Sequence, residues 1–182
     1  MFFIFAGLAG LPAAAGAGEI EGVKFADRYA AGKTAMVLNG VGLYRYKKII
    51  KAYVGALYLG EKTSPRDVFK DVPKRLELHY FWAIKGPDFG KEADRFLGKN
   101  FPPAVLEPLK ARLLRLHALY EDVKPGDRYA LTYVPGTGME LALNGKVKGV
   151  IEGSDFAEVY YTIWLGEKAD NQPFRLQLLD IK

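Results

Sequence analysis

The sequence contains no cysteine, and only two histidines and two serines occur among its 182 residues. The absence of cysteine excludes disulfide bonds, thiolate metal sites and redox chemistry at sulfur. His79 and His117 have no further ligands at metal-binding spacing, so we expect neither a metal nor another cofactor. Ser64 precedes a proline and Ser154 precedes an expected helix, and neither lies in the Gly-x-Ser-x-Gly turn of a hydrolase. The residue inventory therefore does not indicate a serine hydrolase.

Phosphate-binding loops and blocks of basic residues are missing as well. The segment Gly40-Val41-Gly42 lacks the third glycine of a dinucleotide fingerprint, and a strand rather than a helix is expected after it. The net charge of +5 comes from basic residues that are spread along the chain. On a strand, Lys47 and Lys51 would share one face while Lys48 would lie on the other. We therefore expect no nucleic-acid partner.

The first residues differ in composition from the rest of the chain. Residues 1–11 are nearly all apolar, and Ala15-Gly16-Ala17 fits the small-x-small pattern of a signal-peptide cleavage site. The apolar run is too short to span a bilayer comfortably. We expect residues 1–17 to be a signal peptide and the protein to be periplasmic or secreted. Residues 18–182 then form a single domain with no stable membrane span.

The spacing of apolar residues predicts the order of strands and helices. Turn dipeptides, among them Asn39-Gly40 and Asn144-Gly145, separate several of these segments. Strands and helices are grouped rather than strictly alternated, which indicates an α+β fold with a largely antiparallel sheet covered on one face by helices. The expected strands are 20–25, 35–38, 46–59, 75–80, 129–133, 139–143, 146–151 and 174–178, and the expected helices are 89–97, 109–120 and 156–165.

Arg45 is the residue that most suggests a binding site. It follows a glycine-containing segment, and Tyr44, Tyr46 and Tyr53 flank it in the sequence. A guanidinium group is always charged and binds a carboxylate through two parallel hydrogen bonds. One interpretation is therefore a buried anion anchor with apolar walls and a tyrosine hydroxyl nearby. The other is an exposed arginine that pairs with an aspartate or a glutamate.

Several segments in order resemble the chalcone isomerase-like family, in particular its exported bacterial branch. The main segment is Asn39-Gly40-Val41-Gly42, followed by Arg45 and by Lys51-Ala52-Tyr53-Val54-Gly55-Ala56-Leu57-Tyr58-Leu59. Pro73 to Leu78, Gly86 to Phe89 and Phe156 to Gly166 resemble later segments of the same family. The resemblance covers residues 20–180 and implies an antiparallel sheet covered by helices, with an apolar cleft between the two layers.

The resemblance also implies which residues occupy the site of the plant enzymes, which cyclise a chalcone to a flavanone by adding a phenolate within the molecule. The arginine that holds the anion there corresponds to Arg45. The threonine and tyrosine that order a water and the ketone correspond to Tyr53 and Phe89. The asparagine and the small hydroxyl residue that contact the far ring correspond to Phe96 and Ala157. Phe89, Phe96 and Ala157 have no side-chain hydrogen-bond donor, so chalcone isomerase activity is not expected.

The retained arginine in a more apolar site is similar to non-catalytic relatives, which bind fatty acids through that arginine and a tyrosine. The resemblance therefore implies a binding protein for an apolar or fatty-acid-like carboxylate ligand, with Arg45 as the anchor and Tyr53, Tyr44 or Tyr46 as the tyrosine. Phe89 and Phe96 would line the cleft. Two alternatives stay open at this point. One is an intramolecular lyase that uses Arg45 and Tyr53, and the other is an interaction protein whose cleft is filled core.

Overall fold

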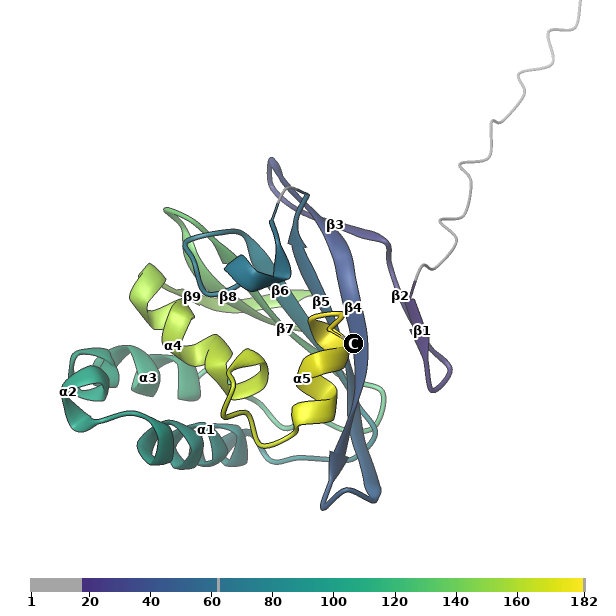
Figure 1. The fold of residues 1–182 in the computed structure, drawn as a ribbon. Helices are drawn as coiled ribbons and strands as arrows, with labels where there is room; N and C mark the ends of the chain where they lie inside the picture. The colour runs from purple at the N-terminus through teal and green to yellow at the C-terminus, as the bar shows by residue number, and fades with distance from the viewer. Residues whose placement is uncertain (1–17, 62, 182) are drawn as a thin grey trace, which may run out of the picture.

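The computed structural model describes residues 18–61 and 63–181, so the predicted signal peptide, residues 1–17, lies outside the described residues. Seven antiparallel strands form one sheet in the order β3-β4-β5-β6-β7-β8-β9, while β1 and β2 pair separately (Figure 1). The strands are β1 Gly18–Ile20, β2 Val23–Phe25, β3 Arg28–Ala31, β4 Thr34–Tyr46, β5 Ile50–Gly60, β6 Lys74–Tyr80, β7 Arg128–Val134, β8 Gly138–Leu143 and β9 Lys146–Ile151. The helices are η1 Pro65–Asp67, α1 Gly86–Asn100, α2 Pro103–Leu106, η2 Glu107–Leu109, α3 Lys110–His117, α4 Ser154–Leu165 and α5 Gln172–Leu178.

The fold is α+β with an antiparallel sheet and helices on one face, as predicted. Strand β6 separates two apolar cores. Leu76, Leu78 and Tyr80 alternate along β6 and pack with the helices. Arg75 directly precedes Leu76 and faces the other side of the sheet. It is nevertheless buried, because residues from β1 to β3 cover that face. Figure 1 shows the β1–β2 hairpin on the side opposite α1 to α4. Within residues 18–61 and 63–181, no helix has the length and apolar character needed to cross a membrane.

The turn predicted at Asn39-Gly40 is wrong, because both residues lie inside the long strand β4. The glycine is needed there for close packing. A Cβ atom on Gly40 would lie 2.3 Å from the carbonyl oxygen of Gln177 and 2.6 Å from that of Leu178. The Asn39 side-chain amide donates a hydrogen bond to the Leu178 carbonyl oxygen at 2.7 Å. These residues therefore form a seat for α5 and do not reverse the chain.

Two other segments do reverse the chain where a single strand was expected. The predicted strand 20–25 is the β1–β2 hairpin, with Glu21 and Gly22 at positive φ between its strands. The predicted strand 46–59 begins at Ile50, because Lys47 and Lys48 turn the chain with φ of 48° and 66°. Glutamate and lysine are unusual at positive φ, so neither turn has a strong sequence signal.

The last predicted strand, 174–178, is also wrong, because this segment forms α5. Asn171 caps the helix by accepting a hydrogen bond from the Phe174 backbone N–H at 3.0 Å. Pro173 lies in the first turn, where its missing N–H costs nothing. Phe174 and Leu178 are four residues apart and are both buried, so their spacing fits a helix face as well as a strand face.

Candidate functional site

Three of the predicted site residues, Tyr44, Tyr53 and Phe89, lie in one aromatic cluster between the sheet and the helices. The rings of Tyr44 and Tyr53 stack with centroids 4.5 Å apart, and the Phe174 ring meets both of them edge-on. Tyr80 contacts Tyr53 at 5.5 Å and Phe89 at 5.6 Å between centroids. The structure therefore brings these three predicted residues together, through aromatic contacts rather than around an open cleft.

The space at the Tyr80 and Phe89 end of this cluster, which we call the inner cavity, has a volume of only about 20 Å³. Phe89 and Tyr120 stack across it at 4.9 Å. A volume of this size holds about one water molecule, whereas small-molecule sites usually measure several hundred Å³. The inner cavity is therefore already filled by side chains of the protein. Its lining residues are Leu76, Leu78, Tyr80, Phe89, Tyr120, Tyr129, Leu131, Leu141 and Trp164.

The tyrosine hydroxyls of the cluster are poorly suited to acid–base chemistry at neutral pH. Burial raises the pKa of Tyr53 and of Tyr80 well above 10. The hydroxyls of Tyr120 and Tyr160 lie 3.1 Å apart and bond to each other. Burial also raises the pKa of both of these tyrosines. A general base works best when its pKa lies near the working pH, so this cluster offers none.

Arg45 and Tyr46 do not join the aromatic cluster. Both are exposed at the end of β4, and the Arg45 Nη1 donates to the Ile49 carbonyl oxygen at 3.5 Å. The expected burial of Arg45 is therefore wrong: β4 runs two residues further than the cluster and carries the guanidinium out to the turn. Arg45 is not one of the described residues that line the inner cavity. Its role in ligand binding stays a prediction.

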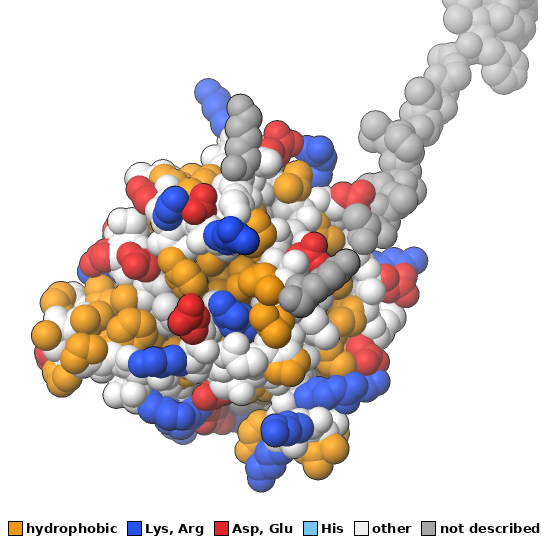
Figure 2. All heavy atoms as spheres, viewed as in Figure 1, with side chains coloured by type: hydrophobic (Ala, Val, Ile, Leu, Met, Phe, Trp, Pro, Cys, Tyr) orange, Lys and Arg blue, Asp and Glu red, His pale blue; other side chains and the backbone are white. Residues whose placement is uncertain are grey.

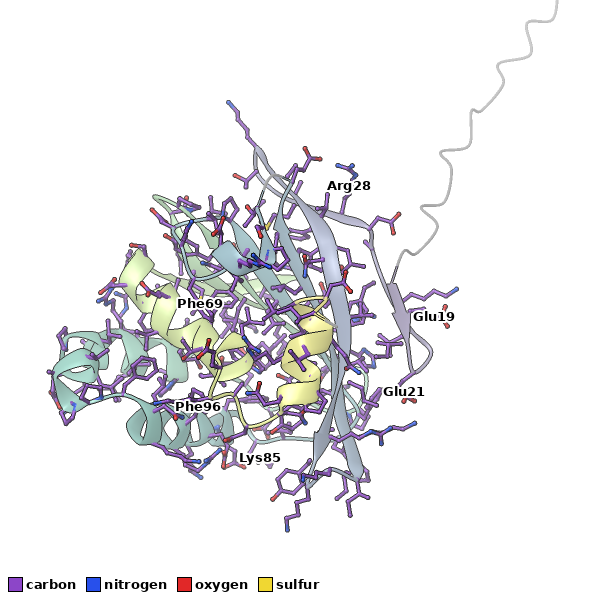
Figure 3. The ribbon with its side chains drawn as sticks, viewed as in Figure 1. Glu19, Glu21, Arg28, Phe69, Lys85 and Phe96 are labelled. Atoms are coloured by element: carbon purple, nitrogen blue, oxygen red, sulfur yellow. The ribbon has the colours of Figure 1, made fainter. Side chains whose placement is uncertain are left out.

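A second hollow, which we call the outer pocket, has a volume of about 380 Å³. It lies between α1, α4 and the segment around η1, and Phe96 is the predicted site residue that lines it. Figure 3 labels Phe69 and Phe96, which come from the segment before β6 and from α1. The volume falls in the range of small-molecule sites. Its lining residues are Phe69, Phe96, Asn100, Phe101, Glu158, Val159, Thr162, Gly166, Glu167 and Lys168.

A buried lysine holds one wall of the outer pocket in place. Lys74 is only 1% exposed. Its ammonium group donates to the carbonyl oxygens of Val68 and Lys70 at 2.7 and 2.8 Å, the residues directly before and after Phe69. Burial lowers the pKa of Lys74 to about 8. Burying the Lys74 ammonium therefore costs free energy. Its two hydrogen bonds fix the segment that carries the Phe69 ring.

The polar groups of the outer pocket are few and carry opposite charges. Lys168 supplies one cation, whereas Glu158 and Glu167 supply two carboxylates, and all three are exposed. The Asn100 amide nitrogen donates to the Phe96 carbonyl oxygen at 2.8 Å, so its amide oxygen is the group that can accept from a ligand. Within the described ranges, no cluster of three histidine, aspartate or glutamate side chains could hold a metal ion.

Most residues of the outer pocket carry no recognisable signal in the sequence. Phe69, Phe101 and Thr162 belong to no motif, and they meet only where α1, α4 and the segment after η1 pack together. Ala157, expected at the far end of a cleft, is fully buried in α4. Lys74 lies in the family-like segment Pro73 to Leu78, and no role was predicted for its side chain. Its position, in register with the alternating apolar residues Leu76, Leu78 and Tyr80, was the available signal that it faces the core.

Comparison with known proteins places this geometry in a family. A family model described as chalcone isomerase-like matches residues 17–180, and no curated protein matches the chain. The crystal structure of a fatty-acid binding protein from Arabidopsis thaliana is similar in fold, with a TM-score of 0.65 at 16% sequence identity. That match covers 87% of this chain and 92% of the Arabidopsis chain. The matched residues span nearly the whole sequence, and the protein therefore belongs to the chalcone isomerase-like family.

Proposed function

We propose that this protein binds an apolar or amphipathic small molecule in the outer pocket and does not transform it. The observation that carries the proposal is the pair of volumes: the outer pocket offers about 380 Å³ between aromatic walls, and the inner cavity offers about 20 Å³. The Arabidopsis protein of similar fold is a fatty-acid binding protein, which supports a ligand of the same general kind.

The apolar walls account for most of the expected affinity. Phe69, Phe96, Phe101 and Val159 line the pocket, and each Å² of apolar surface removed from water contributes about 25 cal/mol. A carboxylate head group would pair with the Lys168 ammonium and would be repelled by the neighbouring Glu158 and Glu167. An anionic head group therefore adds little net affinity. Arg45, at the exposed end of β4, would reach the ligand only if that region changed shape.

The lyase alternative requires Arg45 and Tyr53 to act on one substrate. The Arg45 guanidinium is exposed beside the Ile49 carbonyl oxygen, while Tyr53 packs among Tyr44, Tyr80 and Phe174. Burial raises the pKa of Tyr53 well above 10, so it would not give up its proton at neutral pH. No feature of this arrangement favours the reaction, and binding without catalysis is the better-supported function.

A filled-pocket variant tests the proposal. Val159 lies half-buried on α4 at the pocket, and Val159→Trp should occupy the hollow with an indole ring. We expect titration with dodecanol or dodecanoate, followed by calorimetry, to show saturable binding to the wild type. In Val159→Trp the affinity should fall at least about tenfold, which corresponds to about 1.4 kcal/mol.

Val147→Trp is the matched control, because Val147 is exposed on β9 and does not line the outer pocket. This control should bind like the wild type. Native mass spectrometry of the purified protein should also reveal a co-purifying apolar species that Val159→Trp lacks. The proposal is overturned if folded wild-type protein binds neither compound, or if Val159→Trp and Val147→Trp bind equally well.

Export forms a separate part of the proposal. It is supported by the apolar run at residues 1–11 and the small residues at 15–17. Sequencing the N-terminus of the protein recovered from its native cells should give a chain that begins near Gly18. A mature chain that still begins at Met1 and stays in the cytoplasm would contradict export, while the ligand proposal would stand unaffected.

A further inference from the structure

The end of the β4–β5 hairpin exposes large apolar side chains beside basic ones. We call residues 45–51 together with Trp82 the hairpin tip. Ile49 is 77% exposed, Trp82 59%, Tyr46 53% and Ile50 44%. Figure 2 shows hydrophobic and basic side chains gathered at the projecting lower end of the molecule, where Figure 1 places the turn between β4 and β5. Isolated exposed apolar residues are ordinary, but a cluster of four marks an interaction surface.

The backbone of the hairpin tip is held in one conformation. Lys47 and Lys48 are the central residues of a turn closed by a hydrogen bond from the Ile49 N–H to the Tyr46 carbonyl oxygen at 3.2 Å. The indole N–H of Trp82 donates to the Lys51 carbonyl oxygen at 2.8 Å, which fixes the ring beside the hairpin. The apolar side chains are therefore presented to solvent by an ordered element.

The charge of the hairpin tip has one sign. Arg45, Lys47, Lys48 and Lys51 are its charged residues, and the segment 45–51 contains no aspartate or glutamate. Lys51 pairs with Glu21 of the β1–β2 turn, which leaves three cations around the apolar cluster. The sequence pattern had separated these lysines onto two faces of a strand. The structure places Lys47 and Lys48 together in the turn, where both are exposed, and the Lys47 ammonium lies over the Tyr46 ring at 5.4 Å from its centroid.

We propose that the hairpin tip docks the protein on a membrane surface that contains anionic phospholipids. Tryptophan and tyrosine favour the membrane–water interface, where an apolar ring and a polar edge are both satisfied. Ile49 and Ile50 enter the acyl boundary, while the lysines stay at the level of the phosphates. Two copies of this chain would bring six cations together tip to tip, so the tip is a poor surface for self-association. This surface is separate from the outer pocket and does not depend on the proposed ligand.

Vesicle co-sedimentation of the full chain tests the proposal. Wild-type protein should bind vesicles of phosphatidylcholine mixed with phosphatidylglycerol, and should bind phosphatidylcholine alone far more weakly. Lys47→Asn/Lys48→Gly removes two charges and introduces the residue pair that favours a turn with two positive φ angles, so the hairpin keeps its shape. Each lysine near an anionic surface contributes about 1 kcal/mol, and about 1.4 kcal/mol corresponds to a tenfold change in affinity. The affinity of this double variant for the mixed vesicles should therefore fall about 30-fold. Ile49→Ser should weaken binding about tenfold through lost apolar burial.

Matched variants away from the tip serve as controls. Lys99→Gln/Lys124→Gln removes two exposed lysines, and Leu114→Ser removes an exposed leucine from α3. Both controls should bind like the wild type. All variants share residues 1–17, so any contribution from that apolar segment is equal in each. The proposal is overturned if the wild type does not bind the mixed vesicles, if the tip variants bind as well as the wild type, or if the controls lose as much affinity as the tip variants.

Discussion

The inner cavity and the outer pocket are both lined by aromatic rings, yet one is closed and the other is open. In the aromatic cluster next to the inner cavity, α5 is pressed onto the sheet through Phe174, which meets Tyr44 and Tyr53. Cβ atoms added to Gly42 and Gly55 would lie 2.9 and 2.7 Å from the Phe174 ring, so that ring sits where two side chains are absent. At the outer pocket, Lys74 instead ties the Phe69 segment through its backbone carbonyls. Aromatic lining alone therefore does not make a binding site. Whether a space stays open depends on the contacts that hold its walls in place.

The largest effect that would separate the two regions comes from truncating their phenylalanines. Phe174 is buried against Tyr44 and Tyr53, so Phe174→Ala should lower the free energy of unfolding by about 3–5 kcal/mol. Phe69 is half-buried at the wall of the outer pocket, and Phe69→Ala should cost less than half as much. Urea denaturation of both variants measures the difference. Equal losses would contradict the distinction between a closed and an open region.

The next effect is a pH dependence that arises from Lys74. Its pKa in the folded protein is about 8, and its ordinary value is 10.5. Between these values the unfolded chain binds the extra proton, so stability should rise with pH by at most about 3 kcal/mol. Lys74→Met removes this rise, and urea denaturation at a series of pH values compares it with the wild type.

Buried tyrosines reverse the trend at higher pH. Burial raises the pKa of Tyr58 and of Tyr133 to about 12, so the folded protein keeps protons that the unfolded chain releases above 10. Stability should therefore fall between pH 10 and 12 in both the wild type and Lys74→Met. A wild type that is no more sensitive than Lys74→Met between pH 8 and 10 would show that the lysine is not buried as a cation.

The smallest effect tests the seat of α5. Gly40→Ala places a Cβ against two backbone carbonyls of α5 and should cost about 1–3 kcal/mol. Gly98→Ala is the control, because a Cβ at that position on α1 meets nothing within 4 Å. An alanine in a helix is favoured over glycine by about 0.5–1 kcal/mol, so this control should stabilise the protein. Thermal unfolding that ranks the two variants in the opposite order would rule out close packing as the reason for Gly40.

The antiparallel sheet and the main helices could be predicted because their apolar spacing is regular. In β6 the alternation of Leu76, Leu78 and Tyr80 matches the observed faces. The spacing of Phe174 and Leu178 suits a strand or a helix equally, and only the Asn171 cap with Pro173 distinguishes them. Asn39-Gly40 has the composition of a turn, but both residues stay in the strand because α5 packs directly against them.

The candidate site could be predicted only in part, because its geometry depends on contacts between distant segments. Tyr44, Tyr53 and Phe89 lie in one closed aromatic cluster, and their role in ligand binding stays a prediction. The burial of Arg45 depended on where β4 ends, and strand ends carry weak signals when lysines form the turn. The Phe69 wall depends on hydrogen bonds from Lys74 to backbone carbonyls, which no side-chain pattern in the sequence reveals.

The most direct test of the account is to locate a bound ligand by NMR during titration with dodecanol. We predict that the methyl resonances of Val159 and Thr162, which line the outer pocket, shift in a saturable way. The ring resonances of Tyr53 and of Phe89, which lie in the closed cluster, should stay unchanged. Saturable shifts at Tyr53 and Phe89 with none at Val159 and Thr162 would place the ligand in the aromatic cluster and contradict the account.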